Sequence, residues 1–289
     1  MSEPARILCI AGPTASGKSS RAVEEALARG GEVISVDSRQ VYRMLDIGTE
    51  KITREEMRGV PHHLIDIRDP KDSYSAGDFA KDAGRLIGEI HSRGNVPILA
   101  GGTHFYFDAL LRGIPEETEL DPTYRAELEA LSNEELFERV QEKDPRRAAE
   151  LDPHNRRRLV RALELIRKYG KVPARAPKAR GNYEVGWLVI NPPKEELRER
   201  IDARLESALA RGLVDEVRRV RAHVGDIRLN ELGLEYRIVG EYLRGKRDEA
   251  SLLPTLSAKL RDYARRQRAW LRKLGLNQIK GAGLNSDRN

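Results

Sequence analysis

The sequence of this chain of 289 residues gives no reason to expect an intramolecular disulfide, a membrane span or a secretion signal. Its single cysteine, Cys9, excludes an intramolecular disulfide, which is typical of proteins in the reducing cytoplasm. No run approaches the ~20 apolar residues that a helix needs to cross a bilayer. The N-terminal apolar stretch is too short for a signal peptide and lacks a basic start. We therefore expect a cytoplasmic protein with no membrane segment, in which Cys9 is a core residue.

Two further absences narrow the function classes. His62, His63 and His104 do not have metal-ligand spacing with any cysteine, which argues against a structural zinc site. An Asn-Lys-x-Asp motif, with which GTPases read guanine, occurs nowhere, which counts against an RNA-binding GTPase.

Apolar residues make up 39% of the chain, enough for a core, and its length predicts two domains or one with an insertion. Nothing demands an oligomer, so we expect a monomer.

Charge is unevenly distributed in this basic chain, whose net charge is +6. Residues 116–145 hold 11 acidic and 3 basic side chains, whereas residues 146–180 hold 12 basic and 3 acidic ones. A second basic run, 259–273, holds 7 basic residues and 1 acidic residue. Such separation of sign favours a polyanion-binding face, although a solvated helix face would explain either run alone.

A phosphate-binding loop follows the first apolar run. Gly12, Gly17, Lys18 and Ser19 fit the pattern G-x-x-x-x-G-K-[ST]. We expect the N–H groups of residues 14–19 to converge on a phosphate. Lys18 would add a positive charge, and the Ser19 hydroxyl is placed to bind Mg²⁺. Most such loops hold ATP or GTP, and the motif alone does not say whether this one does.

The elements around this loop predict an α/β fold with a P-loop NTPase-like parallel sheet and helices on both faces. The expected strands are residues 6–11, 33–36, 96–100 and 185–190, and the expected helices are residues 19–29, 79–93, 194–211 and 254–274. Ligands of such sheets bind at the carboxyl ends of the strands. Asp37 and Thr103 follow two of these ends, so both should point toward the phosphate loop.

An all-helical insertion, residues 116–182, separates residues 1–115 from residues 183–289 in this interpretation. Three Asp-Pro pairs, at residues 121, 144 and 152, are typical of helix caps followed by proline in the first turn. Ser132 and Glu135 have the spacing of a capping box. Later in the segment, Arg157 and Arg161 share one helix face, opposite an apolar face, which suits contacts to phosphodiesters.

Four polar residues of the core allow more than one interpretation. Asp37 can bind a metal, act as a general base or cap the turn that follows it. Thr103, after two glycines, can contact a substrate or belong to a plain turn. Arg200 and Arg204 lie four residues apart on a predicted helix and so share one face. They can be a pair of surface residues or can bind phosphates together.

Nine segments become specific when they are read together: GPTASGKS, VISVDSRQVY, DIGTEK, PHHLIDI, YSAGDF, PILAGGTHFY, NRRRLVRALE, RERIDARLE and YARRQRAWLR. In this order, over residues 6–272, the chain resembles the tRNA dimethylallyltransferases (isopentenyl-pyrophosphate:tRNA transferases). The resemblance implies transfer of a dimethylallyl group from dimethylallyl diphosphate to a tRNA, with Mg²⁺ as cofactor. The acceptor would be the exocyclic N6 of the adenosine immediately 3′ of the anticodon.

The resemblance also implies roles for individual residues. Asp37 matches the general base, with Thr103 and Arg204 as further catalytic positions and Arg204 near the diphosphate. The diphosphate-binding positions are Gly12, Pro13, Thr14, Ala15, Ser16, Gly17, Lys18 and Ser19, with Mg²⁺ near Ser19. The tRNA-binding positions are Asp37, Ser38, Arg39, Gln40, Thr103, Arg125, Arg157, Arg158, Leu159, Val160 and Arg161.

The chain departs from the family in two places. Residues 231–245, ELGLEYRIVGEYLRG, stand where an Ile-Gly-Tyr-type segment is common, and Phe105 stands where leucine is commoner. The resemblance therefore assigns no contact to residues 230–240.

A small-molecule kinase is the main rival interpretation, because it would share the loop and the acid at a strand end. Residues 146–180, with a net charge of +9, count against it, and whether ATP also enters the loop stays open.

Overall fold

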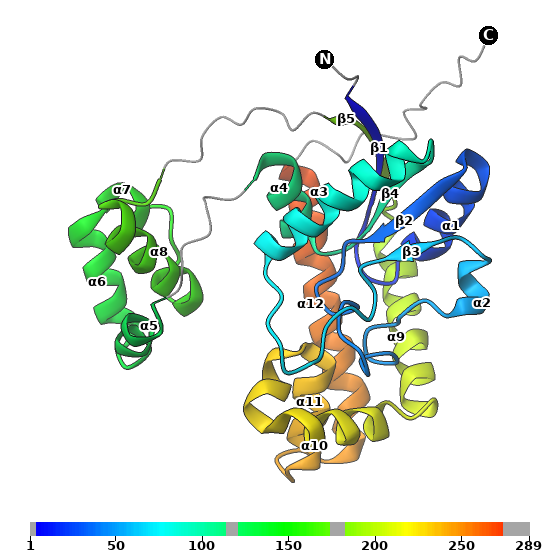
Figure 1. The fold of residues 1–289 in the computed structure, drawn as a ribbon. Helices are drawn as coiled ribbons and strands as arrows, with labels where there is room; N and C mark the ends of the chain where they lie inside the picture. The colour runs from blue at the N-terminus through cyan, green and yellow to red at the C-terminus, as the bar shows by residue number, and fades with distance from the viewer. Residues whose placement is uncertain (1–3, 114–120, 174–182, 274–289) are drawn as a thin grey trace. The chain divides into compact units, whose positions relative to one another are not determined.

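The computed structural model describes residues 4–113, 121–173 and 183–273 of the chain. These residues belong to two compact units. The core unit comprises Met1–Arg112 and Arg180–Asn289, and the insertion unit is Gly113–Ala179 (Figure 1).

A five-stranded parallel sheet forms the centre of the core unit, in the order β3-β2-β4-β1-β5. The strands are β1 (Ala5–Ala11), β2 (Gly31–Ser35), β3 (His62–His63), β4 (Val96–Gly101) and β5 (Tyr183–Val189). Ala11, the last residue of β1, pairs with Gly101 of β4 and Val189 of β5. The carboxyl ends of neighbouring strands therefore meet at one edge. This confirms the predicted P-loop-like α/β class; the sequence interpretation lacked the short edge strand β3.

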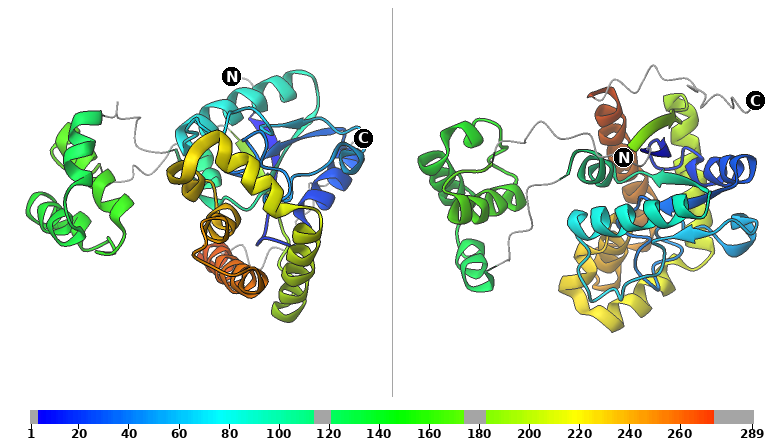
Figure 2. Two further views of the ribbon diagram at one scale, coloured as in Figure 1. Left: turned by 90° about the horizontal axis from the view of Figure 1, so that it is seen from below. Right: turned by 45° about the horizontal axis from the view of Figure 1, so that its top comes forward.

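Helices cover both faces of the sheet, because alternate residues of each strand point to opposite sides. Leu8 and Ile10 of β1 belong to a core shared with α1 (Lys18–Arg29), whereas Cys9 belongs to a core shared with α3 (Ala76–Ser92). The two helices lie on opposite faces of the sheet (Figure 2). Cys9 is buried as predicted, and burial raises the pKa of its thiol. Leu27 of α1 is apolar but 48% exposed, because it lies about 100° further round the helix than the buried Ala26.

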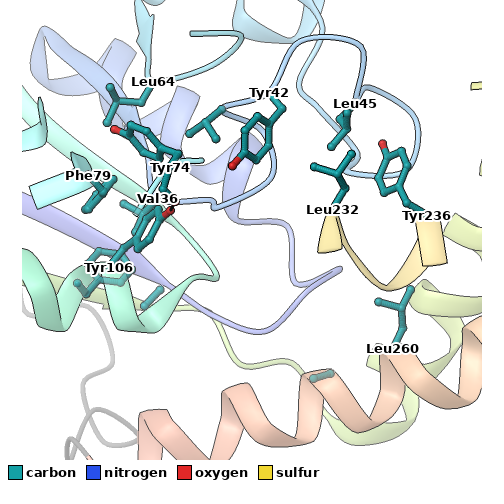
Figure 3. Close-up of a cluster of buried hydrophobic side chains, with 14 of the residues drawn as sticks. Val36, Tyr42, Leu45, Leu64, Tyr74, Phe79, Tyr106, Leu232, Tyr236 and Leu260 are labelled. Atoms are coloured by element: carbon teal, nitrogen blue, oxygen red, sulfur yellow. Dashed lines mark hydrogen bonds between the residues drawn. The ribbon is translucent and has the colours of Figure 1, made fainter. Parts of the chain in front are cut away.

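Four helices of the C-terminal part complete the core unit. They are α9 (Lys194–Ala210), α10 (Leu213–Glu231), α11 (Leu234–Leu243) and α12 (Leu252–Lys273). Helix α12 packs against α9 and α11, and α10 packs against α11. Figure 3 shows part of their shared core with the sheet, which includes Leu45, Leu232, Tyr236 and Leu260. Tyr263 of α12 is 37% exposed, because the buried stripe of this helix runs through Leu260, Ala264, Gln267 and Leu271.

Shorter elements link these parts. Helix α2 (Arg54–Met57) precedes β3, and α4 (His104–Arg112) follows β4. A 3₁₀ turn, Glu249–Ser251, leads into α12. Among the residues that the structure describes, no helix is long and apolar enough to cross a membrane.

Helices alone form the described part of the insertion unit: α5 (Pro122–Glu129), α6 (Asn133–Lys143), α7 (Pro145–Ala148) and α8 (Arg156–Tyr169). Their buried apolar residues make a separate core. The predicted proline-assisted caps at Asp121 and Asp144 are present, as is the capping box of Ser132. The third, at Asp152, is wrong: Asp152 only closes a turn onto the N–H of His154, and Asn155 caps α8 instead.

Candidate functional site

The phosphate loop leaves β1 at Ala11 and enters α1 at Lys18. A Cβ atom on Gly12 would lie 2.3 Å from the carbonyl oxygen of Ile190, so only glycine fits. Ala15 and Gly17 have positive φ angles of 58° and 86°. Left-handed residues of this kind curl the backbone so that successive N–H groups line a concave anion-binding surface. The loop therefore has a curled backbone of the kind that binds anions.

Lys18 lies folded over this loop. Its Nζ donates to the carbonyl oxygen of Pro13 at 2.5 Å and approaches Ser16 Oγ at 3.4 Å. Burial lowers the pKa of the Lys18 ammonium from 10.5 to about 8; the nearby Asp37 carboxylate opposes this shift, and Arg204 adds to it. Lys18, Asp37 and Arg204 thus lie close enough to interact, although they come from three separate segments.

Thr14 is held from two helices. Its Oγ1 accepts a hydrogen bond from Arg204 Nη1 of α9 at 2.5 Å, and its N–H donates to Gln267 Oε1 of α12 at 2.8 Å. The expectation that all N–H groups of residues 14–19 converge on a phosphate is therefore wrong for Thr14, because Gln267 already takes that hydrogen bond.

Arg204 reaches the loop from a half-buried position on α9. Its guanidinium also pairs with Glu50 at 3.2 Å and with Glu235 at 3.3 Å, and it donates to the Gly48 carbonyl at 3.4 Å. Burial raises the pKa of Glu235, which Arg204 opposes. Arg200, one turn earlier, is exposed and pairs with Glu196, although its Nη1 would come within 3.7 Å of a Cβ on Gly17. Of the two arginines, Arg204 is the one built into the site.

Asp37 follows β2 and closes the turn after it. Its Oδ1 accepts the N–H groups of Arg39 at 2.8 Å and Gln40 at 3.3 Å. The turn-capping interpretation thus describes one carboxylate oxygen. The other, Oδ2, makes no hydrogen bond to the residues that the structure describes, which leaves one oxygen of a fixed carboxylate for chemistry.

Thr103 ties the end of β4 to the same turn. Its Oγ1 accepts the N–H of Ser38 at 3.0 Å, and its own N–H donates to the carbonyl of Val36 at 3.1 Å. A Cβ on Gly101 would lie 2.0 Å from that Val36 oxygen, so the glycine is what lets the two strand ends meet. The structure therefore brings Thr103, Ser38 and Asp37 together at the edge of the sheet, beside the phosphate loop.

Gln40 belongs to this turn but faces the segment after it. Its side chain accepts from Ser35 Oγ at 3.1 Å and donates to the carbonyls of Thr49 and Glu50 at 3.2 Å. Gln40 therefore holds the DIGTEK segment, which supplies the Glu50 and Gly48 contacts of Arg204. These hydrogen bonds give its side chain a structural role.

Glu216 of α10 was not predicted and anchors the same segment. It is 2% exposed and accepts the N–H groups of Asp46, Ile47 and Gly48 at 3.0, 2.7 and 2.9 Å. Tyr236 donates its hydroxyl to the same carboxylate at 2.7 Å. The segment to which the resemblance assigned no contact thus contributes Tyr236 here and Glu235 to Arg204.

His104 is a buried side chain at the start of α4. Its ring stacks on Trp270, with 4.2 Å between centroids, and its Nε2 has no hydrogen-bond partner among the described residues. Burial lowers the pKa of His104 to about 4, and Lys18 adds to the effect. His104 is therefore uncharged at neutral pH.

Within the insertion unit, the predicted residues separate into three groups. Arg125 and Arg161 both pair with the buried Glu164, at 3.1 and 3.2 Å. Leu159 and Val160, predicted to contact tRNA, have buried side chains that belong to the core of this unit, so those side chains cannot make the contact. Arg157 and Arg158 are exposed. Helix α8 therefore does carry a cationic face. Of the five residues predicted to bind tRNA on this helix, only Arg157 and Arg158 are fully exposed.

The described residues offer few protein ligands for a metal ion. Among the described residues, no three His, Cys, Asp or Glu side chains are grouped so that they could hold one. Ser19 is exposed in the first turn of α1, beside the loop. Mg²⁺ usually takes most of its ligands from water and substrate phosphates, so a serine hydroxyl fits its requirements.

Comparison with known proteins gives a consistent result. The model of a family described as IPP transferase matches residues 40–274. The match begins three residues after Asp37 and does not include the phosphate loop. A tRNA dimethylallyltransferase of Thermomicrobium roseum is 43% identical, over 93% of this chain and 84% of its own length. One of Anaeromyxobacter dehalogenans is 41% identical, over 93% of this chain and 92% of its own.

Two solved structures agree. The tRNA isopentenylpyrophosphate transferase of Bacillus halodurans superposes with a TM-score of 0.69 at 38% identity, covering 92% of this chain and 86% of that one. A eukaryotic dimethylallyltransferase described as acting on tRNA superposes with a TM-score of 0.81 at 28% identity, covering 92% of this chain and 70% of that one.

Proposed function

Because this chain belongs to the IPP transferase family, we infer that it is a tRNA-modifying prenyltransferase. It transfers a dimethylallyl group from dimethylallyl diphosphate to N6 of the adenosine immediately 3′ of the anticodon, giving N6-isopentenyladenosine and diphosphate. The roles proposed for individual residues rest on one observation: Lys18, Arg204 and Asp37 lie close together at the phosphate loop.

Asp37 acts as the general base in this proposal. Adenine N6 is a poor nucleophile because its lone pair is delocalised into the ring. A carboxylate that accepts the N6 proton while the C–N bond forms would accelerate the reaction by roughly 10²–10⁴-fold. Oδ1 is held by the N–H groups of Arg39 and Gln40, so Oδ2 is the oxygen that accepts the proton.

The phosphate loop serves the leaving group. As the bond from C1 to the diphosphate oxygen breaks, negative charge grows on the diphosphate. The loop N–H groups from Ala15 to Ser19, Lys18 and Arg204 stabilise that charge without having to reorganise. Thr14 contributes by holding Arg204 in place. The loop therefore holds a prenyl diphosphate, with no phosphoryl group transferred.

Mg²⁺ is the cofactor we propose. Ser19 would hold it, and the ion would offset charge on the diphosphate oxygens.

The insertion unit binds the tRNA in this proposal. Arg157 and Arg158 on α8 contact phosphates of the anticodon stem–loop, and Arg125 and Arg161 add charge beside them. The target base must leave its stack to reach Asp37, at a cost of a few kcal/mol. Phosphate contacts elsewhere on the stem–loop offset that cost. We expect a monomer that works in the cytoplasm.

The test begins with the unaltered protein, a tRNA that lacks the modification, Mg²⁺ and dimethylallyl diphosphate. Nucleoside analysis by mass spectrometry should detect one N6-isopentenyladenosine per acceptor tRNA. No product, together with consumption of ATP in the presence of a small acceptor, would instead identify a kinase.

Asp37→Asn sharpens this test, because the amide keeps the oxygen that caps the turn and loses only the basic carboxylate. Turnover should fall by roughly 10²–10⁴-fold while tRNA affinity stays within about threefold. A variant that keeps its turnover would show that Asp37 only shapes the turn.

A further inference from the structure

Gln267 connects two parts of the site that lie far apart in the sequence. It is on α12, 5% exposed, in a buried stripe whose other members are apolar except for Ser257. Its Oε1 accepts the N–H of Thr14 in the phosphate loop at 2.8 Å. Its Nε2 donates to the carbonyl of Gly102, after β4, also at 2.8 Å. One side chain therefore joins the ends of two neighbouring strands.

The chemistry of this link is specific to a carboxamide. The Thr14 N–H needs an acceptor, and the Gly102 carbonyl needs a donor. A glutamine supplies both without charge, whereas an ionised glutamate supplies only acceptors and a lysine only donors. The fit is also tight on the other side, because a Cβ on Gly102 would lie 2.5 Å from Nε2.

The two linked segments serve the two substrates of the proposed reaction. Thr14 also holds Arg204, in the half of the site that binds the diphosphate. Gly102 precedes Thr103, which accepts the N–H of Ser38 next to the proposed base. A displacement at carbon needs the nucleophile and the leaving group in line, and a misplacement of about 1 Å can cost roughly 100-fold in rate.

We propose that Gln267 is a positioning residue, which sets the spacing between the diphosphate loop and the turn that carries Asp37. It touches neither substrate and acts through Thr14 and Gly102. This inference rests on the proposed function, because it assigns the loop to the donor and the turn to the acceptor.

Gln267→Met tests the proposal, since methionine has a similar length and can make neither hydrogen bond. We expect kcat at saturating substrates to fall by roughly 10–100-fold, while the KM for dimethylallyl diphosphate changes by less than about threefold. The matched control is Ser257→Ala, which removes another buried hydrogen bond from the same face of α12, the one to Asp202. Its kcat per folded molecule should stay within about twofold.

Gln267→Glu adds a readout that loss of packing would not give. A protonated glutamate has one donor and one acceptor, the same pattern as glutamine, so this variant should regain activity relative to the unaltered enzyme as the pH falls. Further titratable groups of the site are Lys18, Asp37, His104, Glu235 and Tyr263. Both proteins contain them, so their common effect cancels in the activity ratio. The methionine variant should show no such recovery.

The outcomes distinguish failure of the proposed function from failure of the positioning role. If the unaltered enzyme forms no isopentenyladenosine, the proposed function fails. If it is active and Gln267→Met keeps its kcat, or loses no more than Ser257→Ala, only the positioning role is overturned. A constant activity ratio for Gln267→Glu across the pH range would also count against that role.

Discussion

Replacing Glu216 by glutamine should destabilise the segment that holds Arg204. Its carboxylate accepts three backbone N–H groups, those of Asp46, Ile47 and Gly48, and the hydroxyl of Tyr236. A carboxamide of the same shape can present only one oxygen to these four donors. Its NH₂ group must therefore face some of them.

The cost can be worked out from the geometry. The least harmful orientation turns the NH₂ group toward Gly48 and Tyr236, because the tyrosine hydroxyl can rotate and accept from it. The buried N–H of Gly48 is then left without an acceptor, at about 1–3 kcal/mol. The two remaining bonds weaken because the acceptor is no longer charged, although less charge is then buried. The net loss should be roughly 2 kcal/mol, or about 4–8 °C in melting temperature.

Thermal unfolding followed by circular dichroism measures the first effect, and hydrogen exchange locates it. The amide hydrogens of residues 46–48 should exchange faster than in the unaltered protein. Those of the central strands should keep the same ranking of exchange rates. Affinity for dimethylallyl diphosphate should fall, because Gly48 and Glu50 help to hold Arg204. The control is Glu231→Gln on the same helix. Among the described residues its carboxylate, which is 47% exposed, pairs only with Arg228, so its loss should lower the free energy of unfolding by less than about 0.5 kcal/mol.

Equal stability of the Glu216→Gln and Glu231→Gln variants would refute this reasoning. It would mean that the three N–H groups find other acceptors once the carboxylate is gone. Lower stability with unchanged exchange at residues 46–48 would refute it too, since the damage would then lie elsewhere.

Two further predictions concern charge. The affinity for diphosphate should weaken as the pH rises through about 8, because Lys18 then loses the proton that the bound anion favours; Lys18→Arg should flatten this dependence, and calorimetry from pH 7 to about 9.5 would detect it. Joint replacement of Arg157 and Arg158 by alanine should weaken tRNA binding and lower the slope of log affinity against log salt by about one unit for each phosphate that the protein no longer neutralises. The same measurement on Arg147→Ala, an arginine already paired with Glu150, should give an unchanged slope, and equal slopes for both variants would place the RNA elsewhere.

Much of the local structure could be predicted from the sequence, because it depends on neighbouring residues. The loop between β1 and α1 follows from its glycines, and the cap at Ser132 follows from the glutamate three residues later. The end of α1 at Gly30 likewise needs only a residue that adopts a left-handed conformation. Where spacing failed, as at Asp152, a second cap three residues later competed for the same helix start.

The hydrogen bonds that complete the site could not be predicted in this way, because their partners lie far apart in the chain. Glu216 acts on a segment about 170 residues before it, and Gln267 on one more than 250 residues before it. Both residues nevertheless have one signal in the sequence, which is a polar side chain on the apolar stripe of a helix. Glu216 lies beside Val217 and Val220, and Gln267 lies between Ala264 and Leu271. Such a residue predicts a buried hydrogen-bond partner without naming it.

The burial of Cys9 has a practical consequence for optical and magnetic-resonance studies. As the only thiol in the chain, shielded on the sheet and held protonated, it should react slowly with maleimides. New cysteines at exposed positions could then be labelled without first removing the native one. A fluorophore pair, with one dye on the core unit and one on the insertion unit, would report the separation of the two units as tRNA binds.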